Sequence, residues 1–268
     1  MSKVAIITGA SSGIGRALAI QGAKNGYNLS LFARNIAALT DLKAEIQEFS
    51  NVNILITQGD VSIQDDCLSL ITNTIQEFGK INFLINNAGI SMRSLFKDVD
   101  LNVIESLMNT NFWGTVYCTK YALPYLLESK GSVVGVSSIA GFKGLPARTG
   151  YSASKFAMQG FLESMRVENL KTGLHVLIAC PGYTASNIRN TALNDKGQQQ
   201  GDTPLDESKL MSAEVVALEI WKAIEKRKSY LILTLQGKMA VFLNKISSKL
   251  TDILTYNVIK KEPNSPFS

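Results

Sequence analysis

The sequence predicts an α/β fold in which a doubly wound parallel β-sheet of about seven strands carries helices on both faces. Short runs rich in β-branched residues alternate with longer stretches that carry apolar residues at helical spacing. Several of the short runs are apolar throughout, which is typical of strands covered by helices on both faces. A glycine-rich turn also separates the first short run from the first helical stretch.

The predicted elements follow one another along the whole chain. The predicted strands are residues 4–7, 29–32, 53–57, 83–85, 133–136, 176–179 and 230–233. The predicted helices are residues 36–49, 65–78, 101–127, 151–170 and 213–226. Because no linker interrupts this alternation, we expect one domain over residues 1–268, with residues 234–268 as a C-terminal extension. The polar interval 194–206 is predicted to be a loop that covers the site as a lid.

The composition argues against several classes of function. The 268 residues are 46% hydrophobic and 18% charged, with one histidine and a net charge of +5. Cys67, Cys118 and Cys180 have no paired spacing, so neither a disulfide framework nor a metal site is predicted. The apolar run at residues 4–7 is too short for a signal sequence or a membrane span. We therefore expect a cytoplasmic protein that does not bind nucleic acid.

The glycine-rich turn follows the first predicted strand and reads Thr-Gly-Ala-Ser-Ser-Gly-Ile-Gly over residues 8–15. Glycine has no Cβ, so such a turn can bring backbone N–H groups against a pyrophosphate at a helix N-terminus. An ordinary structural turn is the alternative, because the spacing differs from the usual dinucleotide fingerprint. The lysine of a P-loop does not follow the turn, which disfavours a nucleotide triphosphatase. The predicted phosphate-binding residues are Gly9, Ser11, Ser12, Gly13, Ile14 and Gly15.

Ala33 and Arg34 follow directly after the second predicted strand. An acidic residue at this place would bind a ribose 2′-hydroxyl, whereas an arginine attracts a 2′-phosphate. Arg34 therefore favours NADP(H) over NAD(H) as the cofactor. The alternative is a solvated arginine that binds nothing.

Six further segments occur in a fixed order along the chain. They are Asp60-Val61, Asn86-Asn87-Ala88-Gly89, Asn111, Ser137-Ser138, Tyr151-Ser152-Ala153-Ser154-Lys155 and Pro181-Gly182. Together with the glycine turn, and from Lys3 to about Leu233, they closely resemble the classical short-chain dehydrogenases/reductases, whose fold is Rossmann-like. The resemblance implies an oxidoreductase that transfers a hydride between a nicotinamide cofactor and a carbonyl or alcohol substrate.

The resemblance also implies a set of cofactor contacts. They are Asp60 and Val61 at the adenine, Asn87, Ala88 and Gly89 at the adenosine, and Pro181, Gly182, Thr184 and Ser186 at the nicotinamide. The family usually has Val or Ile and then Thr at the last two positions, so the contacts there are open. Asn and Gly also suit tight turns, which is an alternative role for the Asn-Asn-Ala-Gly segment.

Four residues are predicted to carry the chemistry. Lys155 follows Tyr151 by four residues, so both side chains lie on one helix face. The pKa of a free tyrosine is about 10, and we expect the Lys155 ammonium and an oxidised nicotinamide to lower it, which makes Tyr151 the acid/base. Lys155 can also hold the ribose. By the resemblance, Ser138 stabilises charge on the substrate oxygen, and Asn111 holds a water that connects Lys155 to solvent.

Other interpretations of these residues remain. Ser137 could be the reactive serine, although the separation of Ser138 from Tyr151 matches the family. A non-catalytic dinucleotide sensor and an NAD-dependent epimerase on the same fold are alternative functions. His175 is predicted to be a packed histidine, and Cys180 a small buried hydrophobic residue near the cofactor.

The C-terminal extension has a basic amphipathic pattern over residues 238–261. Its apolar residues are Met239, Phe242, Leu243, Ile246, Leu250, Ile253 and Leu254, and Lys238, Lys245 and Lys249 lie between them. The preferred interpretation is a helix that packs over the substrate pocket or a second subunit, because amphipathic helices usually face their own core. The alternative is a helix on an anionic membrane that admits lipophilic substrates.

The sequence says less about substrate and assembly. A small-molecule carbonyl or alcohol with a bulky apolar body is favoured by four residues near the predicted site, Phe142, Leu145, Tyr183 and Ile188. The helices at 101–127 and 151–170 resemble those through which the family forms homodimers and homotetramers.

Overall fold

A seven-stranded parallel sheet forms the centre of the computed structural model, which describes residues 2–184, 188–201, 210–262, 265 and 267. The strands lie side by side in the order β3-β2-β1-β4-β5-β6-β7, and every neighbouring pair is parallel. Their bounds are β1 Val4–Thr8, β2 Asn28–Ala33, β3 Ile54–Gln58, β4 Phe83–Asn86, β5 Ser132–Val136, β6 His175–Cys180 and β7 Tyr230–Ile232. The predicted doubly wound, Rossmann-like α/β fold is confirmed.

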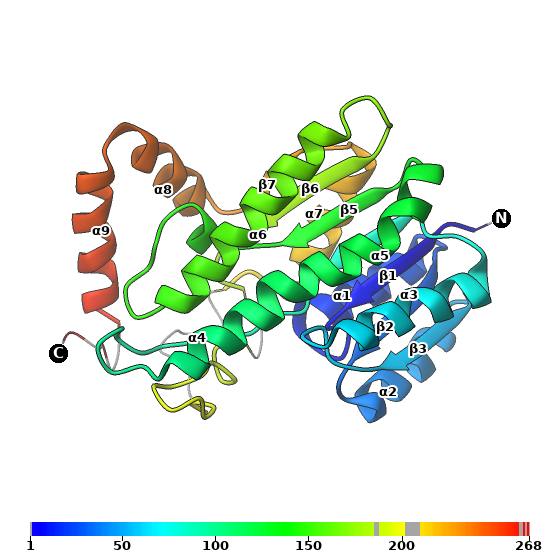
Figure 1. The fold of residues 1–268 in the computed structure, drawn as a ribbon, viewed down its shortest axis with the longest axis horizontal. Coiled ribbons are helices and arrows are strands. Elements are labelled where there is room, and N and C mark those ends of the chain that lie inside the picture. The colour runs from blue at the N-terminus through cyan, green and yellow to red at the C-terminus, as the bar shows by residue number, and fades with distance from the viewer. Residues whose placement is uncertain (1, 185–187, 202–209, 263–264, 266, 268) are drawn as a thin grey trace.

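Helices cover both faces of this sheet (Figure 1). One face packs against α1 Gly13–Lys24, α2 Ile36–Gln47 and α7 Ala213–Glu225, and the other against α3 Gln64–Phe78, α5 Gly114–Glu128 and α6 Thr149–Glu168. Successive side chains of a strand point to opposite faces, so Ala5 and Ile7 enter one core and Ile6 the other. The apolar strands of the sequence are thus explained by two cores.

The helical stretch predicted at 101–127 is built from three pieces. α4 Leu101–Leu107 runs into a π-helical segment, η1 Met108–Trp113, which continues as α5. A π-helical segment widens the turn, and such segments occur often at functional sites. This one contains Asn111, so the widened turn sets where that side chain points.

The C-terminal extension forms two helices, α8 Leu235–Ile246 and α9 Ser248–Lys260. They stand beside the body of the molecule (Figure 1), and Glu262, just after α9, forms an ion pair with Arg93, in the segment that precedes α4. α8 approaches the short 3₁₀ helix η2 Ile139–Gly141, since a Cβ on Gly237 would lie 2.7 Å from Ile139 Cδ1. Among the described residues, no helix is both long and apolar enough to cross a bilayer.

Candidate active site

The predicted site residues gather at the carboxyl edge of the sheet. β1 pairs with β2 on one side and with β4 on the other, so the chain winds in opposite directions from this point. In open α/β sheets, a crevice forms outside the carboxyl ends of the strands at such a switch point. The segments that follow β1, β4, β5 and β6 therefore meet at one edge.

The glycine-rich turn has no room for side chains. Gly9 has a φ of +65°, and a Cβ on it would lie 2.9 Å from Ala88 Cα. A Cβ on Gly15 would lie 2.2 Å from the Gly9 carbonyl oxygen. Real Cβ atoms do not approach other atoms this closely, so the turn after β1 and the segment after β4 require glycine to interlock.

Thr8 and Asn87 join these two segments. The Thr8 hydroxyl oxygen accepts hydrogen bonds from the backbone N–H groups of Asn87 and Ala88, both at 3.0 Å. The Asn87 amide donates to the carbonyl oxygens of Thr8, at 2.9 Å, and Gly9, at 3.3 Å. In the structure, the Asn87 side chain therefore shapes the glycine turn.

The N-terminus of α1 fits a phosphate group. Ser12 is the N-cap residue, with extended backbone, and its hydroxyl makes no capping hydrogen bond. No acidic residue lies in the first turn of α1. Free N–H groups and the positive end of the helix dipole attract anions, so the turn suits the diphosphate of a dinucleotide.

Arg34 and Asp60 meet beside this turn. They follow β2 and β3, which are neighbours in the sheet, and Arg34 Nη1 lies 3.7 Å from Asp60 Oδ2. The side chain of Arg34 is 73% exposed, so it can still turn toward an anionic ligand. The other oxygen of Asp60 accepts hydrogen bonds from the backbone and hydroxyl of Ser62. The sequence predicted both residues as cofactor contacts but did not predict their pairing.

Tyr151 and Lys155 share one face of α6, as their spacing predicted. Lys155 is 3% exposed, and its Nζ lies 5.8 Å from the centre of the Tyr151 ring. Nζ donates a hydrogen bond of 2.9 Å to the carbonyl oxygen of Val136, at the end of β5. Burial lowers the pKa of Lys155 to about 8.

The pKa of Tyr151 is raised in the protein alone. Burial raises it above 10, while a hydrogen bond with Ser138 and the positive charge of Arg148 act in the opposite direction. Lys155 is not among the groups that lower this pKa in the protein alone, and the lowering predicted beside an oxidised nicotinamide stays a prediction. The pKa is raised because Tyr151 is itself buried, and the ammonium of Lys155 is directed toward Val136.

Asn111 is fully buried in η1 and ties two parts of the site together. Its Oδ1 accepts from the Ile90 N–H at 2.8 Å, and its Nδ2 donates to the Ile90 carbonyl at 3.0 Å and to Ser154 Oγ at 2.9 Å. Gly89 leaves the space for this arrangement, because a Cβ there would lie 3.0 Å from Asn111 Oδ1 and 3.4 Å from Lys155 Nζ. The water that Asn111 is predicted to hold stays a prediction.

The two candidate serines have different surroundings. Ser137 is buried, and its hydroxyl accepts a 2.9 Å hydrogen bond from Gln159 Nε2. Ser138 is partly exposed, caps η2 by accepting from the Ala140 N–H at 3.1 Å, and faces Tyr151. These contacts favour Ser138 as the residue that meets a substrate oxygen.

The segment after β6 carries the predicted nicotinamide contacts. A Cβ on Gly182 would lie 2.4 Å from Thr234 Cγ2, so only glycine fits beside the start of α8. Thr184 is buried, and its hydroxyl donates to the Gly182 carbonyl at 3.1 Å. Ser186, also predicted here, lies outside the described residues, as do residues 202–206 of the predicted lid.

The described part of that lid packs on the segment after β4. The backbone of Asp100 donates to the Asp195 carbonyl at 2.9 Å, and Lys196 Nζ lies 3.3 Å from Asp100 Oδ1. Gln200 donates to the Arg93 carbonyl at 2.8 Å. Residues 194–201 are therefore anchored beside the site.

His175 and Cys180 have the surroundings expected of packed residues. His175 is buried, with Nδ1 at 3.0 Å from Ser132 Oγ and Nε2 at 2.9 Å from the Lys228 carbonyl oxygen. It begins β6 and so lies at the amino edge of the sheet, away from the site. Cys180 is fully buried, which raises the pKa of its thiol to about 12.

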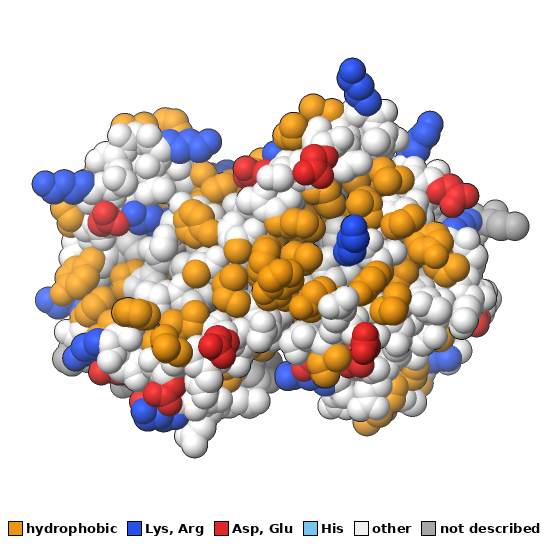
Figure 2. Space-filling model, in the orientation of Figure 1, with side chains coloured by type: hydrophobic (Ala, Val, Ile, Leu, Met, Phe, Trp, Pro, Cys, Tyr) orange, Lys and Arg blue, Asp and Glu red, His pale blue; other side chains and the backbone are white. Residues whose placement is uncertain are grey.

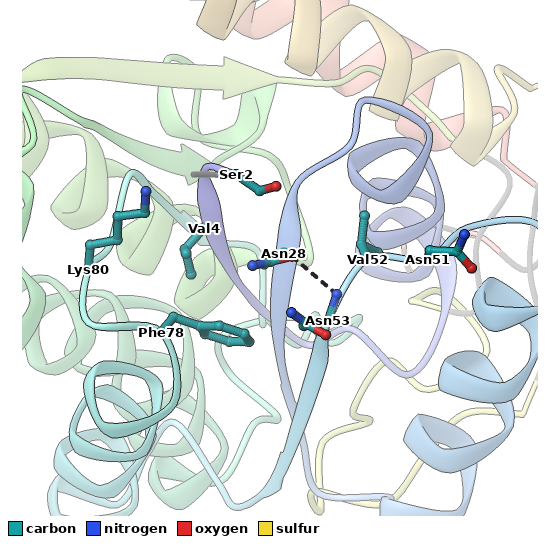
Figure 3. Close-up of a pocket in the computed structure, with 8 residues that line it drawn as sticks. All are labelled: Ser2, Val4, Asn28, Asn51, Val52, Asn53, Phe78 and Lys80. Atoms are coloured by element: carbon teal, nitrogen blue, oxygen red, sulfur yellow. Dashed lines mark hydrogen bonds between the residues drawn. The ribbon is translucent and has the colours of Figure 1, made fainter.

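A cavity of about 530 Å³ opens at the amino edge of the sheet (Figure 3). It is lined by Ser2, Val4, Asn28, Asn51, Val52, Asn53, Phe78 and Lys80. None of these is a predicted site residue, and the cavity lies at the opposite ends of the strands from Tyr151.

Three residues that were not among the predicted site residues support the site through hydrogen bonds. Thr8 joins β1 to the segment after β4, Ser154 holds Asn111, and Gln159 holds Ser137. Thr8 and Ser154 lie inside the motifs that the sequence singled out, so their position was a usable signal. Gln159 follows Lys155 by four residues, so it lies on the same face of α6.

The chain is similar to known short chain dehydrogenases. The family model for short chain dehydrogenases matches residues 3–197. The 11-beta-hydroxysteroid dehydrogenase 1A of Arabidopsis thaliana is 41% identical over 187 residues, which are 69% of this chain and 53% of that protein. The 11-beta-hydroxysteroid dehydrogenase A of Arachis hypogaea is 38% identical over 239 residues, or 88% and 66% of the two chains. The chain thus spans only part of the length of these relatives.

A third relative is matched over more of its length. The dehydrogenase/reductase SDR family protein 7-like of Dictyostelium discoideum is 33% identical over 95% of this chain and 81% of its own. Among solved structures, a short chain dehydrogenase/reductase from Burkholderia phymatum in complex with NAD has a TM-score of 0.84 and 26% identity, over 93% of this chain and 95% of that one. An alcohol dehydrogenase from Thermococcus sibiricus, complexed with 5-hydroxy-NADP, shares the fold with a TM-score of 0.76 and 23% identity, over 87% and 96%.

Proposed function

The chain belongs to the short-chain dehydrogenase/reductase family, and from that premise we propose that it interconverts a lipophilic ketone and its secondary alcohol with NADP(H). One observation carries the proposal. Ser138, Tyr151 and Lys155 meet at the carboxyl edge of the sheet, beside the loop that Asn111 holds. A proton donor and an oxygen-binding hydroxyl thus lie next to a turn that fits a diphosphate.

Each of these residues has a separate role in the proposed reaction. The nicotinamide, when bound, supplies or accepts the hydride. Tyr151 gives its phenolic proton to the substrate oxygen during reduction and takes a proton from the alcohol during oxidation. Ser138 hydrogen-bonds the same oxygen and stabilises its developing charge. Lys155, next to the ring of Tyr151, holds the ribose and lies on the path by which the proton is replaced.

NADP(H) is the cofactor that the charge at the end of β2 favours. Arg34 is the residue there, with no acidic side chain at positions 33 to 35 to repel a 2′-phosphate. Asp60 weakens this preference for NADP(H), because its carboxylate lies 3.7 Å from Arg34 Nη1 and competes with a 2′-phosphate for the guanidinium. A 2′-phosphate carries more charge than one carboxylate, so it can compete for the guanidinium.

A lipophilic substrate is favoured by the relatives and by the loops at the site. The two relatives with the highest identities quoted above are named for 11-beta-hydroxysteroids. Tyr183 is 36% exposed, and Leu145 and Ile188 are partly buried, which leaves apolar surface for a bulky ligand. Phe142 is a weaker candidate, because its ring lies 5.9 Å from that of Tyr230.

The alternatives use fewer of these features. A non-catalytic dinucleotide sensor needs the glycine turn but not Ser138, Tyr151 and Lys155 together. An NAD-dependent epimerase on the same fold would have no use for Arg34, because NAD has no 2′-phosphate for the guanidinium to attract. The complete set of residues therefore favours the dehydrogenase.

The outer surface of α8 and α9 favours contact with an anionic membrane, as part of the same proposal. Leu235, Met239, Phe242 and Ile246 are spaced by three or four residues and are 75%, 55%, 63% and 67% exposed. Residues 235–261 contain five lysines and one aspartate, which complements negative lipid headgroups. Three free, buried cysteines fit a reduced, cytoplasmic setting.

Association into homodimers or homotetramers through α5 and α6 completes the proposal. Figure 2 shows apolar side chains gathered in the middle of the face that these helices form. Phe156 of α6 and Trp113, the last residue of η1, are 45% and 42% exposed, and Trp113 stacks on Tyr117 of α5. Large apolar patches of this kind mark interaction surfaces.

Replacement of Tyr151 by Phe tests the proposed reaction. We expect NADPH-dependent reduction of a panel of steroid and other lipophilic ketones to fall by about 10²- to 10⁴-fold, the usual contribution of a general acid. NADPH binding, followed by its fluorescence, should stay within a factor of about two, because the glycine turn is untouched. The exposed Tyr256→Phe is the matched control. Retained turnover in Tyr151→Phe would overturn the mechanism, and a wild-type protein that binds NADPH but reduces no ketone would favour the sensor.

A further inference from the structure

The loop at residues 142–148 leads from η2 into the helix that carries Tyr151. It ends in a left-handed backbone at Ala147, with a φ of +58°. Such a conformation costs energy for a residue with a Cβ, so the surroundings must hold it. The carbonyl oxygen of Ala147 accepts a hydrogen bond of 2.9 Å from the Ser94 N–H.

The C-terminal extension is bonded to this loop at three places. Asn244 of α8 donates to the Phe142 carbonyl oxygen at 3.1 Å. Asp252 of α9 forms an ion pair with Lys143. Glu262, just beyond α9, forms an ion pair with Arg148, whose Nη2 lies 3.5 Å from Glu262 Oε2.

Glu262 is the most buried of these contacts. Its side chain is 5% exposed, and the same Oε2 lies 3.5 Å from Nη2 of both Arg148 and Arg93, which are 10% and 9% exposed. Tyr183 also lies within the electrostatic reach of Glu262, Arg148 and Arg189. Loss of one partner from a buried ion pair leaves an uncompensated charge, so the carboxylate fixes where the Arg148 guanidinium lies.

Arg148 lies directly before the first turn of α6, where its carbonyl accepts from the Ser152 N–H at 2.8 Å. Its positive charge favours the ionised form of Tyr151 against the effect of burial. The other groups that face Tyr151 are Ser138, Lys155, Cys180 and Tyr183. Of the two cationic neighbours, Lys155 bonds to the Val136 carbonyl, whereas Arg148 pairs with the C-terminal extension.

We propose that Glu262 is a positioning residue, which holds Arg148 where its charge stabilises the Tyr151 phenolate. This inference rests on the proposed function, in which Tyr151 is the acid/base. Glu262 lies 111 residues after Tyr151 in the sequence. Through it, the C-terminal extension would affect the ionisation of Tyr151 in addition to covering the loop.

The pKa of Tyr151 can be measured without turnover. The ultraviolet absorbance of tyrosinate is recorded as a function of pH for each protein and for the same protein carrying Tyr151→Phe. Subtraction of the second titration from the first isolates the phenol of Tyr151. We expect Arg148→Gln to move the titration of Tyr151 upward by roughly half a pH unit to one unit. Glu262→Ala should move it in the same direction, and Glu262→Asp should restore most of the shift. The ascending, acid-side limb of the pH profile of alcohol oxidation should move with it, because Tyr151 acts there as the base.

Matched variants separate this role from a purely structural one. Asp252→Asn breaks an ion pair of the same extension, in which the carboxylate is 67% exposed, and should leave the titration unchanged. Glu262→Gln keeps the size of the side chain and serves if Glu262→Ala does not fold. An unchanged or lowered Tyr151 pKa in folded Glu262 variants would overturn the proposal, because Arg148 would then act without Glu262. Since absorbance needs no substrate, a wild-type protein that reduces no ketone would refute the proposed function and not this inference.

Discussion

At Lys155 the protein keeps an ammonium group almost entirely out of water. Burial lowers its pKa from 10.5 to about 8, so the unfolded chain still binds this proton where the folded protein has released it. Between these two values the unfolded state holds more protons, and stability rises with pH. Below about pH 8 the buried charge therefore works against folding, which is a cost of placing an amine beside Tyr151.

Lys155→Met should remove this pH dependence. The free energy of unfolding of the wild type, relative to the variant, should rise by up to about 3 kcal/mol between pH 7.5 and pH 10.5. Chemical denaturation of both proteins at both pH values measures this difference in the free energy of unfolding. Because both proteins contain the same tyrosines, the contribution of tyrosine ionisation at high pH cancels when the variant is subtracted from the wild type. Lys260→Met, at an exposed position of α9, is the control. A difference that stays constant with pH would show that burial does not lower the pKa of Lys155.

At Arg34 the prediction concerns the choice of cofactor. Arg34→Leu removes the guanidinium that faces Asp60 and should weaken NADPH binding by roughly 10- to 100-fold, while NADH binding changes little. Fluorescence titration of both cofactors checks this, with the exposed Lys171→Leu as the control. If NADPH and NADH affinities fall together, Arg34 does not recognise a 2′-phosphate.

At the scale of elements, α8 and α9 have two different sides. Gly237, Val241, Thr251 and Ile259 are buried against the body of the protein, which agrees with the preferred prediction of packing. The stripe of Leu235, Met239, Phe242 and Ile246 stays exposed. The two interpretations of the sequence are thus compatible, because each uses a different side of the helices.

The exposed stripe predicts binding to vesicles that contain anionic lipids. The wild type should float with phosphatidylserine vesicles at low salt and be released as salt rises, because lysines contribute to the attraction. The double variant F242E and I246E should lose this binding and keep NADPH-dependent reduction of a water-soluble ketone. Leu170→Glu, which alters an apolar side chain that is 74% exposed beyond α6, is the control. A wild type that never floats would remove the membrane from the proposal.

At the scale of the whole molecule, the apolar face of α5 and α6 predicts self-association. Wild-type protein should sediment as a dimer or tetramer at micromolar concentration. Phe156→Glu, at a position of α6 that is 45% exposed, should shift it toward monomer, because a carboxylate buried in the interface without a partner is costly. Phe96→Glu, at a position that is 63% exposed outside these helices, should sediment like the wild type. A monomeric wild type would contradict the prediction.

The sequence by itself determined the fold and most of the candidate site, because those signals are local. Strand and helix periodicity is set by a few neighbouring residues, and Gly9, Gly15 and the four-residue step from Tyr151 to Lys155 act through the backbone near them. The order of the motifs then placed them at one edge of a parallel sheet, as the structure has them.

Only the tertiary structure decided the contacts between distant segments. Three of these features have no local signature in the sequence. They are the pairing of Arg34 with Asp60, the π-helical turn around Asn111 and the ion pair of Arg148 with Glu262. The same holds for the effect of burial on Tyr151, which raises the pKa of its phenol in the protein alone. A pKa depends on how much water and which charges surround a group, and those are set by segments that meet only when the chain has folded.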